Sequence, residues 1–212
     1  LVKDYFEVLD RLEAALEHKL SRPVVPSAVE IDSKNFKISA NTEQADNTAH
    51  NEGPVKYAFD KNPNTIWHSS YNPMFTVSAD NPAEITIDMG KSYTINQFSY
   101  LQRPAGGNNG KVQKYNLYVK SNQADKWKKI VTDGTFADKQ ELQKVTFDEV
   151  EAQYVKFEVT QGFGNFATAA ELAVYQKASD FSKLQEAMDE AEKLERTKYL
   201  EVYYSNIDQL CE

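Results

Sequence analysis

Cysteine is almost absent from this sequence of 212 residues. The single cysteine, Cys211, stands next to the C-terminus, so neither an internal disulfide nor a cysteine-based zinc site can form. Histidine is also scarce, and His18, His50 and His68 do not show the close spacing of a metal-ligating pair. No Gly-x-Ser-x-Gly turn occurs, and no two carboxylates are singled out as a hydrolytic pair. The sequence therefore predicts a protein that is not an enzyme.

Long apolar runs and excess positive charge are absent as well. No stretch approaches the roughly 18 apolar residues that a membrane-spanning helix requires, so we expect no membrane insertion. The formal net charge is −8, which disfavours nucleic acid, because binding it depends on neutralising phosphates. Neutral ligands and divalent cations are the favoured partners. The first six residues lack the basic and apolar regions of a signal peptide, and we interpret the chain as a mature protein or as part of a longer one with further domains.

Helical patterns stand near both ends of the chain. Apolar residues recur every three or four positions in residues 1–22 and again in residues 178–212, which predicts amphipathic helices there. Pro23 and Pro26 end the first pattern and open a predicted linker over residues 23–34.

The central part of the chain, residues 35–177, has a period of two instead. Apolar and polar residues alternate in residues 84–89, 115–120 and 154–159, and Gly, Asn and Asp mark turns between such runs. Short alternating strands joined by polar turns are typical of an antiparallel sandwich of two sheets. The sequence thus predicts a mainly β protein, an antiparallel β-sandwich flanked by N- and C-terminal α-helices.

Three sequence blocks in this region carry a family resemblance. They are Tyr57 to Ser69, with the run Ala-Phe-Asp-Lys-Asn-Pro-Asn-Thr-Ile-Trp-His; Ile85 to Val119; and Val145 to Leu172, which ends in Ala-Ala-Glu-Leu. In this order and spacing they resemble the discoidin, or coagulation factor 5/8 type C, family. Within that family the chain is similar to the bacterial carbohydrate-binding modules of family 32.

The resemblance implies a discoidin-like (galactose-binding-like) fold and a non-catalytic function. The implied ligands are glycans with a terminal galactose-type or N-acetylhexosamine sugar. The implied context is a secreted or surface glycan-degrading protein, so the expected location is extracellular or at the cell surface. Animal members of the family bind lipid headgroups or proteins through apolar loop tips, and Met74 and Phe75 could form such a tip here. A lipid- or protein-binding module, or a spacer without sugar affinity, is therefore the alternative.

A polar loop from Asp60 to Thr65 offers carboxylate, amide and hydroxyl oxygens, the donors that Ca²⁺ prefers. The resemblance implies one structural Ca²⁺ here. Side-chain oxygens would come from Asp60, Thr65 and Glu171, and carbonyls from Asn62 and Ala170. The alternative is an Asx-turn without metal.

A neutral sugar presents hydroxyls in set directions and one apolar C–H face. Planar polar groups such as Arg and Asn can bridge adjacent hydroxyls, and an aromatic ring can cover the C–H face. The resemblance implies that such groups converge from loops at one end of the sandwich, with Phe163 preferred to Phe166 as the aromatic plate. The implied ligand site consists of His68, Tyr71, Arg103, Asn108, Phe163, Phe166 and Glu52.

Each polar member of this set has an alternative role. His68 could be a buried structural histidine, Tyr71 could cap the end of the sandwich, and Arg103 could pair with an acidic residue. Asn108 lies in Gly-Gly-Asn-Asn-Gly, where asparagine also suits a turn. Trp67, between the loop and His68, is interpreted as a core residue.

Overall fold

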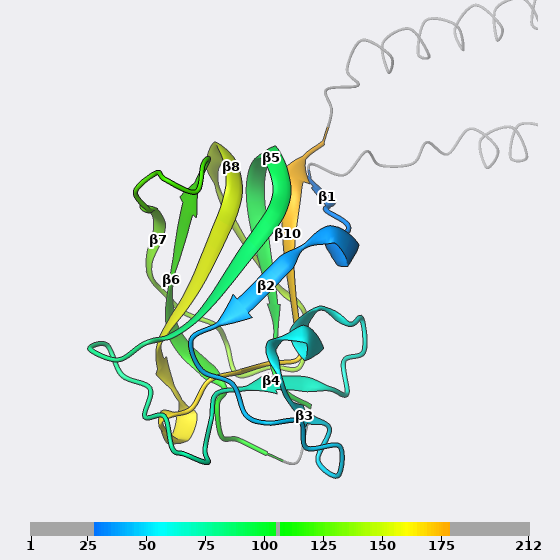
Figure 1. Cartoon of the computed structure of the whole chain (residues 1–212), viewed down its shortest axis with the longest axis vertical. Helices are drawn as coiled ribbons and strands as arrows, with labels where there is room; N and C mark the ends of the chain where they lie inside the picture. Colours follow the sequence, from blue (N-terminus) through cyan, green and yellow to red (C-terminus); the bar gives the residue numbers. More distant parts are fainter. Residues whose placement is uncertain (1–27, 105–106, 179–212) are drawn as a thin grey trace, which may run out of the picture. The chain divides into compact units, whose positions relative to one another are not determined.

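The computed structural model describes residues 28–104 and 107–178, and the helices predicted in residues 1–22 and 178–212 lie outside this part. The described residues contain ten strands and three short 3₁₀ helices (Figure 1). The elements are β1 (Ala28–Glu30), η1 (Ser33–Asn35), β2 (Lys37–Ala40), β3 (Glu52–Gly53), η2 (Val55–Phe59), β4 (Ile66–His68), β5 (Ala83–Leu101), β6 (Val112–Lys120), β7 (Lys128–Gly134), β8 (Gln143–Gly162), η3 (Phe163–Asn165), β9 (Thr168–Ala169) and β10 (Glu171–Lys177). None of the described helices could span a membrane.

The strands pair almost entirely antiparallel. The larger sheet has the order β1-β10-β5-β8-β6-β7, with β2 also paired to β5, and a small sheet has the order β3-β4-β9. The predicted antiparallel β-sandwich is confirmed.

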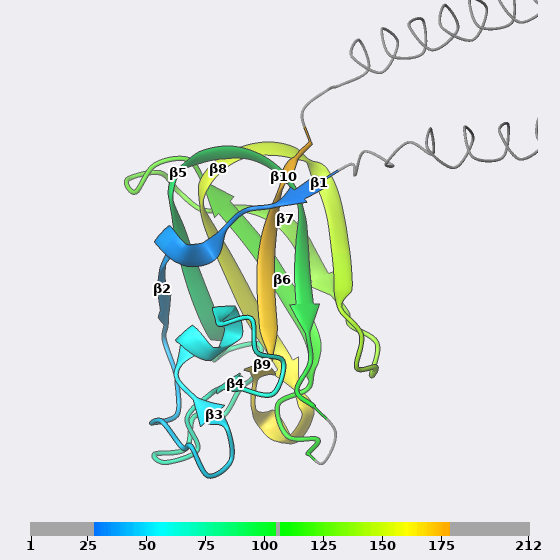
Figure 2. The same cartoon turned by 90° about the vertical axis from the view of Figure 1, so that its right-hand side faces the viewer.

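Two long strands, β5 and β8, form both layers of the sandwich. Residues 83–88 of β5 pair with residues 154–159 of β8, whereas residues 93–100 pair with residues 143–152. The ladder is interrupted around Gly90, whose φ of 80° lies in the left-handed region that suits glycine. Near this interruption both strands bend over one end of the sandwich, at the top of Figure 2. Each strand therefore contributes residues to the two facing layers.

The core lies between these layers and is rich in aromatic side chains. Phe157 packs against Phe98 and Tyr115, with ring centroids 5.3 and 5.6 Å apart. Trp67 is fully buried, as expected, and its Nε1–H donates to the carbonyl of Thr42 at 3.1 Å. Alternating residues of β5, β6 and β8 fill the remaining space, in agreement with the period of two: Ile85, Ile87, Met89, Leu117, Val119, Val155 and Val159.

The predicted linker over residues 23–34 is wrong in its second half. β1 pairs with the end of β10, with Ala28 opposite Lys177, and η1 follows it. Three residues are too few to show an alternating pattern, and their partner strand lies at the other end of the domain sequence, so a local pattern cannot reveal the pairing.

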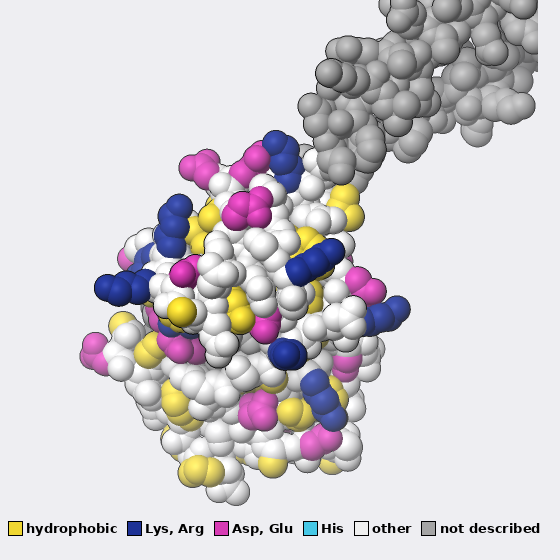
Figure 3. Space-filling model, turned by 45° about the horizontal axis from the view of Figure 1, so that its top comes forward, with side chains coloured by type: hydrophobic (Ala, Val, Ile, Leu, Met, Phe, Trp, Pro, Cys, Tyr) yellow, Lys and Arg dark blue, Asp and Glu magenta, His cyan; other side chains and the backbone are white. Residues whose placement is uncertain are grey.

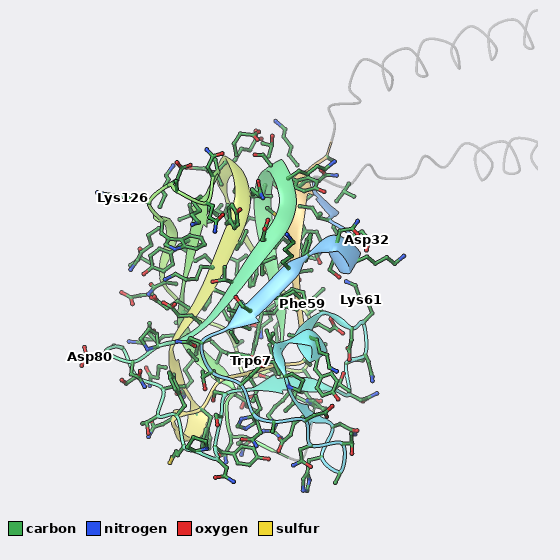
Figure 4. The ribbon with its side chains drawn as sticks, in the orientation of Figure 1. Asp32, Phe59, Lys61, Trp67, Asp80 and Lys126 are labelled. Atoms are coloured by element: carbon green, nitrogen blue, oxygen red, sulfur yellow. The ribbon has the colours of Figure 1, made fainter. Side chains whose placement is uncertain are left out.

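The two ends of the described domain therefore leave from one end of the sandwich, while β3, β4, β9 and η3 gather at the opposite end (Figures 1 and 2). The surface around the β5–β8 arch, seen in Figure 3, carries interspersed acidic and basic side chains with scattered apolar ones. Figure 4 shows Phe59 and Trp67 within the domain, whereas Lys61 and Asp80 lie at its outer margin.

Replacing Phe157 by alanine tests the aromatic core. Phe157 is fully buried, and truncating a buried Phe typically lowers the free energy of unfolding by about 3–5 kcal/mol. Chemical denaturation should show this loss. Phe163→Ala is the matched control, because Phe163 is 48% exposed and surface changes usually stay within about 0.5 kcal/mol. Equal losses in both variants would contradict this description of the core.

Candidate functional site

Three loops meet at the end of the sandwich opposite the chain ends: the loop after β4, the loop after β5, and η3. They enclose an open pocket of about 480 Å³, here called the ligand pocket. All seven side chains of the predicted ligand site lie in its wall, although they come from separate parts of the sequence. The lining residues are Glu52, His68, Tyr71, Arg103, Gly107, Asn108, Asn109, Phe163 and Phe166.

Backbone hydrogen bonds hold the three loops together. Ser69 N–H donates to the carbonyl of Ala167 at 2.8 Å, and Ala167 N–H donates back to the Ser69 hydroxyl at 3.0 Å. Gly110 N–H donates to the carbonyl of Phe163, and Thr168 N–H donates to the carbonyl of Gly110, both at 2.8 Å. These hydrogen bonds fix the pocket wall relative to the small sheet of β3, β4 and β9.

His68 lies at the end of β4 and is 4% exposed. Its Nδ1 is 2.6 Å from the carbonyl oxygen of Ser69, and because a carbonyl only accepts, Nδ1 carries the proton. Burial lowers the pKa of His68 below its ordinary value of 6.5, so the ring is neutral near pH 7. Nε2 is then a hydrogen-bond acceptor. The ring also meets Tyr71 edge-on at 5.3 Å and Phe166 at 5.4 Å between centroids.

Tyr71 is held in place by its hydroxyl and its backbone. The hydroxyl donates to Glu52 Oε1 at 2.9 Å and accepts from Asn47 Nδ2 at 3.0 Å. The backbone N–H donates to Gln44 Oε1 at 3.0 Å. Tyr71 as a whole is 37% exposed, so its position is set while part of its surface faces solvent. Glu52 therefore lines the ligand pocket and also orients Tyr71.

Arg103 follows β5 and supplies the pocket's positive charge. Its Nη1 donates to the carbonyl of Asn109 at 2.8 Å, whereas its buried Nε has no hydrogen-bond partner among the described residues. A Cβ added to Gly107 would lie 2.6 Å from Nη2, so glycine at this position makes room for the guanidinium. Within residues 28–104 and 107–178 no acidic side chain pairs with Arg103, and the contact that is found is to a backbone carbonyl.

The aromatic side chains of the pocket differ in exposure. Phe163, in η3, is 48% exposed, whereas Phe166 is partly buried and packs on His68. Phe163 thus has the free ring face expected of a plate for a sugar, and Phe166 supports the histidine. Gly164 and Asn165 between them have φ values of 69° and 60°, which turn the chain sharply enough to bring both rings to one pocket.

Sequence reasoning missed Gly107 and Asn109 as lining residues, and Asn47 and Gln44 as supports of Tyr71. The first two lie in the glycine- and asparagine-rich loop, so the repeated asparagine was an available signal. Asn47 and Gln44 lie in an irregular segment before β3 without any sequence pattern.

The apolar loop tip considered for lipid binding is only partly present. Met74 is 62% exposed, but Phe75 packs against the hydrophobic core. A single exposed methionine offers little apolar area for insertion into a lipid surface.

The polar loop after η2 is closed by hydrogen bonds around Asp60. Asp60 Oδ1 accepts from Asn62 N–H at 2.9 Å, and Oδ2 accepts from the Thr65 hydroxyl at 2.7 Å. Lys61 adopts a φ of 62°, a left-handed conformation that costs a non-glycine residue about 1–2 kcal/mol. Its ammonium forms an ion pair with Glu30 of β1.

Glu171 begins β10 and lies near this loop. Both carboxylate oxygens are buried, and no hydrogen bond of good geometry reaches them from the described residues, although the backbone N–H of Asn62 lies close enough to favour the charged form. Burial, followed by the nearby charge of Asp60, raises the pKa of Glu171 to about 7. Buried polar atoms are normally satisfied, so the chemistry of this carboxylate suits a cation, and the hard oxygens of the Asp60–Thr65 loop are of the kind that Ca²⁺ prefers.

A family model described as the F5/8 type C domain matches residues 37–172. The chain belongs to the F5/8 type C domain family. This match covers well over half of the sequence and confirms the resemblance derived from the three sequence blocks.

Solved structures related to this F5/8 type C domain are carbohydrate-binding modules. CpGH89CBM32-5 from Clostridium perfringens, in complex with GalNAc-beta-1,3-galactose, is 38% identical with a TM-score of 0.61, covering 69% of this chain and 99% of that chain. The family 32 module of C. perfringens NanJ, in complex with galactose, is 29% identical with a TM-score of 0.59, covering 70% and 99%. The described part of the chain thus has the fold of a non-catalytic binding module.

Among curated proteins, the A type blood N-acetyl-alpha-D-galactosamine deacetylase of Flavonifractor plautii is 36% identical over 125 residues, which is 58% of this chain and 15% of that protein. The chain spans between 15% and 24% of the length of such curated relatives.

The raised pKa of Glu171 predicts a pH-dependent stability of the metal-free protein. Between its ordinary value of 4.5 and about 7, the folded protein keeps a proton that the unfolded chain releases. The stabilisation is complete below pH 4.5 and is lost as the pH rises through 7. Melting temperatures in chelator should therefore fall over this range, and Glu171→Gln should reduce the fall.

Glu141→Gln provides the control, because this carboxylate lies in an exposed loop before β8. It should leave the pH dependence as it is. Identical pH profiles for Glu171→Gln and the unchanged protein would show that Glu171 does not titrate in this window.

Proposed function

We propose that this F5/8 type C domain is a non-catalytic carbohydrate-binding module that holds a terminal galactose-type or N-acetylhexosamine sugar in the ligand pocket. The observation that carries the proposal is the convergence of the neutral His68, the Arg103 guanidinium and the exposed ring of Phe163 in one pocket. Related modules with solved structures hold galactose or GalNAc-beta-1,3-galactose.

The hydrogen-bonding roles of the pocket are complementary. His68 Nε2 accepts a hydroxyl hydrogen, Arg103 donates, and the amide of Asn108 can do both. Together these groups can pair with the 3- and 4-hydroxyls of one sugar ring. An axial 4-hydroxyl beside the histidine favours galactose over glucose. Tyr71 and Phe163 would contact the C–H face of that ring.

A shallow pocket with few hydrogen bonds supports weak binding. We expect a dissociation constant of about 10⁻³ to 10⁻⁴ M, equivalent to about 4–5.5 kcal/mol. Such modules add affinity to a longer protein through multiple contacts. The proposed context is therefore an extracellular or surface protein that acts on glycans, which this domain would target to its substrate.

We also propose that the Asp60–Thr65 loop and Glu171 hold one structural Ca²⁺. Side-chain oxygens of Asp60, Thr65 and Glu171 would be joined by carbonyls of Asn62 and Ala170. The unpartnered carboxylate of Glu171 supports this assignment. None of these residues lines the ligand pocket, so the cation would stabilise the fold without touching the sugar.

Arg103→Ala tests the sugar site. A hydrogen bond to a charged group contributes about 1.5–3 kcal/mol, so losing Arg103 should take so weak a complex below detection. Calorimetric titration with galactose, N-acetylgalactosamine, N-acetylglucosamine and glucose measures the effect. Lys126→Ala, which removes a positive charge from a distant loop tip (Figure 4), should bind like the unchanged protein.

Melting curves of each variant confirm that it is folded. Equal sugar binding by Arg103→Ala and the unchanged protein would refute the site, whereas a preference for glucose would refute the sugar assignment alone.

Chelation tests the proposed Ca²⁺. A cation bound only by the folded state stabilises it by about 2.7 kcal/mol at 100 times its dissociation constant. Chelator should therefore lower the melting temperature, and added Ca²⁺ should restore it. Asp60→Asn should weaken the response and Asp80→Asn, at an exposed loop tip, should not. An unchanged melting temperature, with no metal by elemental analysis, would remove the assignment.

A further inference from the structure

A second pocket adjoins the ligand pocket and shares two of its residues, Arg103 and Gly107. Its volume is about 300 Å³, and it is here called the side pocket. It is formed by the segment before β3, the end of the polar loop after η2, the first residue of β4, and residues that follow β5. Its lining residues are His50, Asn51, Asn64, Ile66, Arg103, Pro104 and Gly107.

Three polar side chains of the side pocket have no hydrogen-bond partner among the described residues: His50, Asn51 and Asn64. Their backbones, in contrast, are engaged. His50 N–H donates to the carbonyl of Asn47 at 3.0 Å, the Asn51 carbonyl accepts from Ile66 N–H at 2.9 Å, and Asn64 N–H donates to Asn62 Oδ1 at 3.2 Å. The main chain is therefore held in place while an imidazole and two amides remain available to a ligand.

The chemistry of these groups suits an uncharged polar molecule. Each amide offers donors and an acceptor in one plane, which can bridge neighbouring hydroxyls. Pro104 is partly exposed and adds apolar surface, whereas Ile66 is only 2% exposed, and no carboxylate lines the side pocket. A second sugar ring has the required combination of hydroxyls and C–H surface, whereas a cation would lack an anionic ligand.

Arg103 stands where the two pockets meet. Its Nη1 donates to the carbonyl of Asn109, and its Nε is buried with no hydrogen-bond partner among the described residues. A guanidinium has five N–H donors in one plane, so Arg103 can donate to hydroxyls on either side. The missing side chain of Gly107 leaves the space in which this group lies between the pockets.

We propose that the side pocket is a subsite for the sugar residue to which the terminal sugar is joined, so that the domain recognises the last two residues of a neutral glycan. This inference rests on the proposed function of the ligand pocket. Asn51 and Asn64 hydrogen-bond the hydroxyls or the N-acetyl group of the second ring, with His50 at its edge. Arg103 contacts both rings.

The test compares galactose with a panel of neutral galactose-terminated disaccharides in β-1,3, β-1,4 and β-1,6 linkage, by calorimetric titration of the full chain. At least one disaccharide should bind about 3- to 10-fold more tightly than galactose, the gain expected from one or two net hydrogen bonds. The double variant Asn51→Gly and Asn64→Ala should bind that disaccharide no better than galactose, and should bind galactose as the unchanged protein does.

Glycine is chosen at position 51 because the φ of Asn51 is 54°, a conformation that glycine adopts without strain. Asn35→Ala, which removes an exposed amide in η1 at the other end of the sandwich, is the matched control and should keep the disaccharide preference. Melting temperatures show whether each variant is folded.

Equal affinity for galactose and all disaccharides would overturn the subsite while leaving the proposed function standing. The same conclusion would follow if the double variant kept the disaccharide preference. Absence of binding to any sugar would instead overturn the proposed function, and the subsite with it.

Discussion

The ligand pocket depends on the backbone hydrogen bonds that join its three loops. Ser69 pairs with Ala167 in both directions, and Gly110 links Phe163 to Thr168. These hydrogen bonds join each loop of the pocket to a neighbouring loop, and the loops continue into strands, so their movement is restricted. The side chains of the pocket are therefore positioned before any ligand arrives, which reduces the entropic cost of binding.

Buried polar atoms without a partner mark both proposed sites. Nε of Arg103 is buried without a hydrogen-bond partner among the described residues, beside the ligand pocket and the side pocket. The same is true of the two carboxylate oxygens of Glu171, beside the polar loop. Burying such groups unpaired costs free energy, so a ligand that supplies a partner would stabilise them, although Asn96 Oδ1, Gln97 Nε2 and Thr168 Oγ1 are also buried without a partner among the described residues. The partner of Arg103 would be sugar hydroxyls, and the partner of Glu171 a cation. The opposite charges of these groups keep the two assignments distinct.

The position of each aromatic residue in the sandwich decides whether it is buried in the core or exposed at the ligand pocket. Phe98 of β5 and Phe157 of β8 are buried between the layers, and Trp67 of β4 is buried as well, whereas Phe163 and Tyr71 lie beyond the strand ends and remain partly exposed. The two exposed aromatic residues of the ligand pocket lie on end loops, where binding residues are commonly found. This explains how one domain carries both a large aromatic core and an aromatic binding surface.

The sequence by itself determined the sandwich, because a period of two over residues 84–89, 115–120 and 154–159 buries one face of each strand whatever its partner. It also determined seven of the nine residues that line the ligand pocket, through the order of motifs that resemble the family. Only the tertiary structure decided the pairing of β1 with β10, the separate roles of Phe163 and Phe166, and the side pocket formed by His50, Asn51 and Asn64. These features depend on contacts between distant segments, for which no local periodicity exists, since the pairing energy is shared between residues far apart in the chain.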